Sequence, residues 1–212
     1  MGVVRRVVTG ALVLAGLLVS NVQAQSLPKI NEFYFDDDVA AKPIHAVPPE
    51  QADAVDQLMK LRERGRKGTE ATAQLASIAY RDGRGELGDK LYQEALGSVA
   101  ATSVQARSLR WNHGWDLYRG GDAQNALDHW AMAAEGTRTN PSWLPPTLAL
   151  ALWNLGRKDE AVAWYAAAVR TEPGQWSDAA SYPQLLPLWT DAERAQLAQV
   201  QQAWSANPPA WP

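Results

Sequence analysis

The sequence contains no cysteine among its 212 residues. This absence excludes disulfides, zinc sites built from thiolates and cysteine nucleophiles. It also excludes a lipid-modified cysteine near the expected signal cleavage site described below. A secreted chain without disulfides depends on its hydrophobic core for stability, and a chain of this length is sufficient to form one.

The sequence also lacks the common motifs of catalytic and cofactor sites. We find no Gly-x-Ser-x-Gly elbow, phosphate-binding loop or dinucleotide fingerprint. The three histidines, His45, His113 and His129, do not have the i, i+4 spacing of a metal-binding helix. The acidic run Asp36–Asp38 lacks the spacing and the glycine of a calcium loop. We therefore predict that the protein is not an enzyme and has no cofactor and no metal site.

No apolar run is long enough to favour a membrane-spanning helix. The longest, Val7–Val19, follows two arginines and precedes the small residues Val22-Gln23-Ala24. These three zones in this order predict a secretory signal over residues 1–24, cleaved near Ala24, and hence a periplasmic protein without a stable membrane anchor. The net charge of −3, made more negative by loss of Arg5 and Arg6, argues against nucleic acid as a partner.

No segment shows the alternation of a β-strand, whereas helical spacing recurs along most of the chain. Residues 25–49 are rich in proline and are expected to be extended. We expect a leading helix over 50–65, helical pairs over 69–176, and an irregular segment followed by a capping helix over 177–212. In the last helix, Thr190 and Glu193 have the spacing of a capping box, and Leu197, Val200 and Trp204 form an apolar stripe.

One segment nearly repeats itself 35 residues later. Small and large residues recur in the same order, since Gly114, Leu117, Gly121, Ala126, Trp130 and Ala133 match Ala149, Leu152, Gly156, Ala161, Tyr165 and Ala168. A weaker copy upstream contains Ala76, Ala79, Gly83, Gly88, Tyr92 and Ala95. Small residues allow two helices to approach closely, and glycine allows a tight turn with positive φ. The pattern predicts stacked helical hairpins, each covering the apolar face of its neighbour.

This pattern resembles the tetratricopeptide repeat (TPR). The match is best over Asp159–Pro173, while the middle copy has Arg138 where the family has proline and the first copy has Gly88 where the family has alanine. The resemblance implies three repeats, over about 69–103, 107–141 and 142–176. It implies an all-α fold, a right-handed superhelical array of antiparallel helix pairs with an N-terminal arm and a C-terminal capping helix.

In this family the first helix of each pair lines a concave groove. Carried over by position, the resemblance implies a partner-binding surface that combines aromatic rings with arginines: Tyr80, Arg81, Trp111, Trp115, Tyr118, Arg119, Trp143, Leu150, Trp153 and Asn154. Aromatic and arginine side chains are typical of binding hot spots. We therefore expect a non-enzymatic periplasmic scaffold that binds a segment of another cell-envelope protein or peptide.

Three other interpretations remain open. The ten tryptophans are also consistent with a helical core, in which Trp130 packs inside and Trp164 is exposed. Exposed tryptophans also stack on sugar rings, so a module that binds peptidoglycan or another carbohydrate is an alternative. In the third, the chain fills its own groove: Asn31–Asp38 carries three aromatics and an acidic run that complement Arg81 and Arg119, and the array is structural.

Overall fold

The computed structural model describes residues 27–30, 37–64, 66–135, 137 and 140–210. The predicted signal, residues 1–24, and most of the aromatic segment 31–38 lie outside these residues. The described part of the chain is all-helical and has no strand, as predicted. No helix within it is long and apolar enough to cross a membrane.

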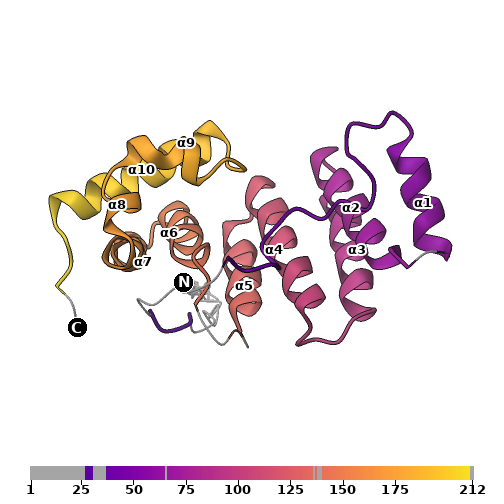
Figure 1. Ribbon diagram of the computed structural model, residues 1–212, viewed down its shortest axis with the longest axis horizontal. Helices are drawn as coiled ribbons and strands as arrows, with labels where there is room; N and C mark the ends of the chain where they lie inside the picture. Colours follow the sequence, from indigo (N-terminus) through magenta and orange to yellow (C-terminus); the bar gives the residue numbers. More distant parts are fainter. Residues whose placement is uncertain (1–26, 31–36, 65, 136, 138–139, 211–212) are drawn as a thin grey trace, which may run out of the picture.

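The main helices pack as neighbouring pairs (Figure 1). A leading helix α1 (Ala54–Arg64) packs on α2, and three pairs follow: α2 (Gly68–Arg81) with α3 (Gly85–Gly97), α4 (Val104–Arg119) with α5 (Ala123–Ala134), and α6 (Leu144–Asn154) with α7 (Lys158–Thr171). In Figure 1, α2 to α5 run up and down the view, whereas α6 and α7 are seen nearly end-on.

The three pairs share one turn. Gly83, Gly121 and Gly156 all have positive φ, of 74°, 92° and 75°. The residue after each glycine donates its backbone N–H to a carbonyl five residues back, at 2.8 to 2.9 Å, in all three turns. Glycine adopts this conformation without the strain that a Cβ would add. The weaker copy predicted upstream therefore forms the same hairpin as the two stronger copies.

The C-terminal region contains more helix than the sequence predicted. The segment after residue 176, expected to be irregular, forms a 3-10 turn (Ala179–Ser181) and α9 (Tyr182–Leu185), and α8 (Pro173–Trp176) lies just before it. Proline in the first turn of α8 and α9 is compatible with a helix because the N–H groups there have no helical partner. The last helix, α10 (Asp191–Ala206), begins with the predicted Thr190–Glu193 capping box and packs on α6 and α7.

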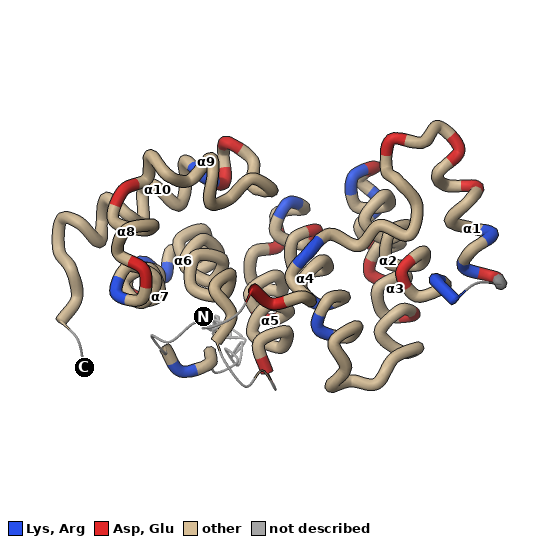
Figure 2. The backbone as a smooth tube through the Cα atoms, viewed as in Figure 1, with Lys and Arg blue, Asp and Glu red and all other residues tan. Residues whose placement is uncertain are grey.

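Two hydrophobic clusters form the core. One joins α4 to α7 with the C-terminal segments and contains the fully buried Trp130 and Tyr165, at the repeated aromatic position. The other lies around α1 to α3 and contains Tyr92, from the first copy, and Leu58. Trp164, expected to be exposed, is 2% exposed and belongs to the first cluster, so that expectation was wrong. Charged residues of both signs are spread along the length of the array (Figure 2).

Candidate functional site

Residues 37–49, here called the arm, turn at residues 38–42 and cross α4 and then α2 before the chain enters α1 (Figure 1). Side-chain amides of α4 and α2 bind the backbone of the arm. Asn112 of α4 accepts a hydrogen bond from the N–H of Ile44 at 3.2 Å and donates to the carbonyl of Lys42 at 2.9 Å. Its side-chain amide thus pairs with the arm as a peptide group would.

Gln74 of α2 does the same at the far end of the arm. Its side-chain oxygen accepts from the N–H groups of Ala46 and Val47 at 2.7 and 3.0 Å, and its amide nitrogen donates to the carbonyl of Val47 at 2.7 Å. Gln74 and Asn112 occupy equivalent positions of the first and second repeats as aligned above, seven residues before Arg81 and Arg119. The same face of two successive repeats therefore carries an amide that binds extended backbone.

The acidic start of the arm does not pair with the arginines that the sequence suggested. Asp38 forms a salt bridge with Arg107 and accepts from the indole N–H of Trp143 at 3.2 Å. Arg119 instead pairs with Glu193 of α10, at 2.8 Å from Nε to Oε1. Asp38 therefore does not pair with Arg81 or Arg119, and residues 31–36 of the expected complement lie outside the described residues, whereas residues 37–49 fold back onto α2 and α4.

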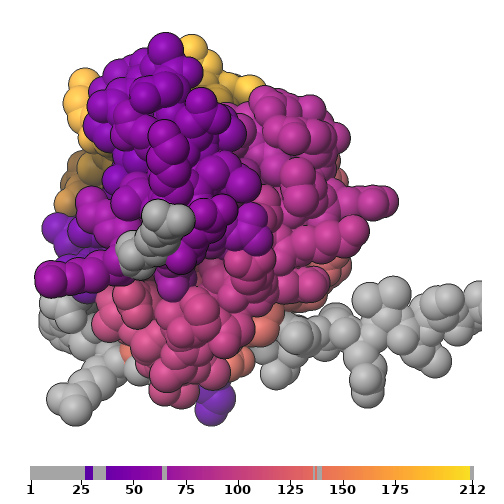
Figure 3. All heavy atoms as spheres, turned by 90° about the vertical axis from the view of Figure 1, so that its right-hand side faces the viewer, coloured from indigo at the N-terminus to yellow at the C-terminus, as the bar shows by residue number. Residues whose placement is uncertain are grey.

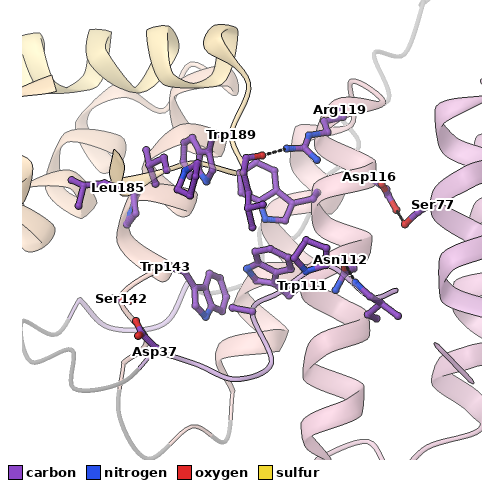
Figure 4. A pocket seen from close by; sticks show the side chains of 18 of the residues that line it. Asp37, Ser77, Trp111, Asn112, Asp116, Arg119, Ser142, Trp143, Leu185 and Trp189 are labelled. Atoms are coloured by element: carbon purple, nitrogen blue, oxygen red, sulfur yellow. Dashed lines mark hydrogen bonds between the residues drawn. The ribbon is translucent and has the colours of Figure 1, made fainter. Parts of the chain in front are cut away.

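A cavity of about 840 Å³ lies beside the arm (Figure 4). Its walls come from the arm, from α2 and α4, from the start of α6 and from residues 172–189. Five tryptophans line it: Trp111, Trp115, Trp143, Trp176 and Trp189. We call this space the aromatic cavity. Figure 3, seen from the α1 end, shows α1 and its neighbours enclosing that end of the array.

The tryptophan rings hold one another in place. Trp115 of α4 contacts Trp111 edge to face, with centroids 6.0 Å apart, and Trp189 in the same way at 5.0 Å. The guanidinium of Arg119 lies 4.9 Å from the centroid of Trp115. Such contacts contribute about 0.5 to 1.5 kcal/mol each beyond the area buried. These rings present a rigid aromatic wall.

The aromatic cavity collects half of the residues that the resemblance implied. Arg81, Trp111, Trp115, Arg119 and Trp143 line it. Trp176 and Trp189 also line it and were missed, because their segment had no helical period. The density of tryptophan and proline in that segment was the available signal.

The other five predicted residues do not line the cavity. Tyr80 donates a hydrogen bond to Asp89 and contacts His113 within the first two pairs. The remaining four lie where α10 covers the last pair: Tyr118 donates to Gln196, Trp153 donates to Gln199, Leu150 is fully buried, and the exposed Asn154 contacts the hydroxyl of Tyr118.

A polar connection between helices reaches the cavity at Asp116. Ser77 of α2 donates to Oδ2 of Asp116 at 2.5 Å (Figure 4). Tyr92 of α3 donates to the same oxygen at 2.6 Å. Burial, and then the nearby Asp116 charge, raise the pKa of Tyr92 well above its usual value. Tyr92 therefore stays protonated and donates a hydrogen bond to the carboxylate.

Two orphan donors also belong to the cavity wall. The indole N–H groups of Trp111 and Trp115 are buried and have no hydrogen-bond partner in the described part of the chain. An unpartnered buried donor costs about 1 to 3 kcal/mol. The wall is therefore not arranged for maximum stability, which is common at binding surfaces.

The described residues contain no group of three or more histidine, aspartate or glutamate side chains arranged to hold a metal ion. Comparison with family models, curated proteins and solved structures finds no match for this chain. The class established by the structure is therefore the all-helical array of neighbouring pairs, with an aromatic cavity beside an extended arm.

Proposed function

We propose that this chain is a TPR-like repeat scaffold of the periplasm, without enzymatic activity, that binds a segment of another cell-envelope protein in the aromatic cavity. The three matching glycine turns and the neighbouring helix pairs support the TPR-like superhelical arrangement. The signal pattern of residues 1–24 supports export.

One observation carries the proposal. The face formed by α2 and α4 holds an extended peptide, the arm, through the side-chain amides of Gln74 and Asn112. The aromatic cavity continues this face toward α6 and is lined by rings suited to apolar side chains. A partner segment placed there would bury its side chains against Trp111, Trp115 and Trp143, as hot-spot residues do.

A displayed library of random twelve-residue peptides tests this function. We expect the full-length mature protein to enrich peptides whose affinity falls at least about 30-fold in Trp143→Ala, the loss of a typical hot spot of 2 kcal/mol. Trp143 is only partly buried, so the variant should keep its helicity by circular dichroism. Trp153→Ala is the matched control, because Trp153 is also partly buried but lies outside the cavity and contacts α10. We expect it to change the affinity less than about twofold, far below a hot-spot loss.

Two results would contradict the proposal. Failure to enrich any peptide, or peptides that bind equally well to Trp143→Ala, would remove the cavity as a peptide site. Retention of the protein by sedimented peptidoglycan, lost in Trp143→Ala, would support the carbohydrate alternative instead.

A further inference from the structure

The charges that line the aromatic cavity are mainly acidic. Among the described residues, three carboxylates (Asp37, Asp116 and Glu172) and two arginines line it. Arg119 is already paired with the buried Glu193 through two hydrogen bonds. Arg81 and Asp37 are both exposed, so solvent and salt screen both of these charges, whereas Asp116 and Glu172 are partly buried. The interior of the cavity therefore favours a positively charged group.

Asp116 is the carboxylate held most firmly. Ser77 and Tyr92 bond the same oxygen from two other helices, which fixes the plane of the carboxylate and leaves Oδ1 without a hydrogen-bond donor in the described part of the chain. No lysine or arginine among the described residues forms an ion pair with Asp116. A partly buried carboxylate without a cation has lost part of its hydration, so a cation that reaches it recovers this energy.

The neighbours of Asp116 suit a long basic side chain. Trp115 precedes it on α4, and Trp111 and Asn112 lie one turn earlier, all in the wall of the cavity. Indole faces attract cations, and Arg119 already makes such a contact with Trp115. The methylene stem of lysine or arginine packs on aromatic rings while its charged end reaches a carboxylate. The cavity thus provides an aromatic wall and a carboxylate side by side.

We propose that Asp116 selects a partner segment that places a lysine or arginine side chain in the aromatic cavity. The charged end pairs with Oδ1 of Asp116, and the stem packs against Trp111 and Trp115. This inference rests on the proposed function, because it names the chemistry of the segment that the cavity binds. An acidic side chain at the same place would meet an unneutralised carboxylate and be rejected.

The library described above also tests this inference in the full-length mature protein. We expect the enriched peptides to carry lysine or arginine at one position next to apolar residues. Asp116→Asn keeps an oxygen that accepts from Ser77 and Tyr92 but removes the charge. We expect it to weaken the best peptide at least tenfold, and to have little effect on a version of that peptide with glutamine in place of its basic residue. The matched control is Glu172→Gln, which removes another carboxylate of the cavity and should have the smaller effect.

The outcomes separate the two proposals. Peptides that require Trp143 but show no basic preference, or whose preference survives Asp116→Asn, overturn this inference and leave the proposed function standing. A larger loss in Glu172→Gln than in Asp116→Asn also overturns it. A library without binders overturns both. Urea unfolding of Asp116→Asn measures any loss of folding stability. The peptide with glutamine in place of its basic residue shows whether such a loss also weakens binding that does not depend on the charge of Asp116.

Discussion

His113 and His129 lie in contact, with ring centroids 4.2 Å apart, where α4 and α5 pack together. The Nδ1 atoms of both rings are buried and have no hydrogen-bond partner in the described part of the chain. Burial, and then the charges of His113 and Arg110, lower the pKa of His129 to about 3, although Asp89 and Asp122 act in the opposite direction. Burial also lowers the pKa of His113, against the opposing effect of Asp89.

These lowered pKa values predict that the protein loses stability in mild acid. The unfolded chain binds a proton at His129 near pH 6.5, whereas the folded chain does so only near pH 3. Stability is therefore fully present above about pH 6.5 and falls as the pH decreases toward 3, by about 1.4 kcal/mol between pH 7.5 and 5.5 from this group alone. Urea unfolding at several pH values should show a shallower loss in His129→Leu.

Met132→Leu is the control for the histidine experiment, because it changes a residue of the same helix that does not titrate. It should shift stability by a similar amount at every pH. Equal pH dependence in His129→Leu and the unsubstituted protein would show that His129 is not the group responsible.

At the scale of the helix pair, Gly114 sets how closely α4 approaches α5. A Cβ at this position would lie 2.4 Å from Nε1 of Trp130. Trp130 is fully buried and donates to the carbonyl of Trp111 at 3.2 Å, so it has little room to move. Gly88 has the same role in the first pair, where a Cβ would lie 2.4 Å from the ring of Tyr80. The ring of Tyr80 therefore explains why Gly88 stands where the family has alanine.

We predict that Gly114→Ala lowers the free energy of unfolding by about 1 to 3 kcal/mol, the usual cost of overpacking. This loss should appear even though alanine favours a helix by about 1 kcal/mol over glycine. Gly97→Ala is the matched control: this exposed residue ends α3 and has no atom within 4 Å of an added Cβ. It should be neutral or slightly stabilising in urea unfolding. A Gly114→Ala protein as stable as the Gly97→Ala protein would contradict this account of the packing.

The helices were predictable where local patterns decide them. The capping box of α10 and the glycine turns follow from short-range chemistry, and the structure has both. Helix α6 begins at Leu144 and carries Pro145 and Pro146 in its first turn. Proline fits the first turn of a helix, where its missing N–H has no partner to lose. The burial of Trp164 depends on tertiary packing, which periodicity alone does not specify.

At the scale of the whole molecule, the site was predictable only in part. Family positions placed Trp111, Trp115 and Trp143 on one surface, and they do line one cavity. The path of α10 over Trp153 and the return of Trp189 to Trp115 are contacts between residues far apart in sequence. Such contacts are set by how the segments fill the remaining apolar surface, which the repeat pattern does not encode.

The arm joins distant parts of the molecule, since it reaches α2 through Gln74, α4 through Asn112 and the start of α6 through Asp38 and Trp143. We predict that Gln74→Ala frees its far end. Three hydrogen bonds are lost, worth about 1 kcal/mol each, so the amides of Ala46 and Val47 should exchange with solvent roughly 100-fold faster.

Hydrogen exchange followed by NMR on the protein measures this release. Gln57→Ala is the control, because Gln57 is another glutamine side chain whose hydrogen bonds, to the exposed Asp53, do not involve the arm. It should leave the exchange of Ala46 and Val47 unchanged. If Gln74→Ala also leaves it unchanged, the arm is held by its apolar contacts, such as that of the buried Val47, rather than by the side-chain amides. In that case the α2–α4 face would lose its main support as a surface that binds extended backbone.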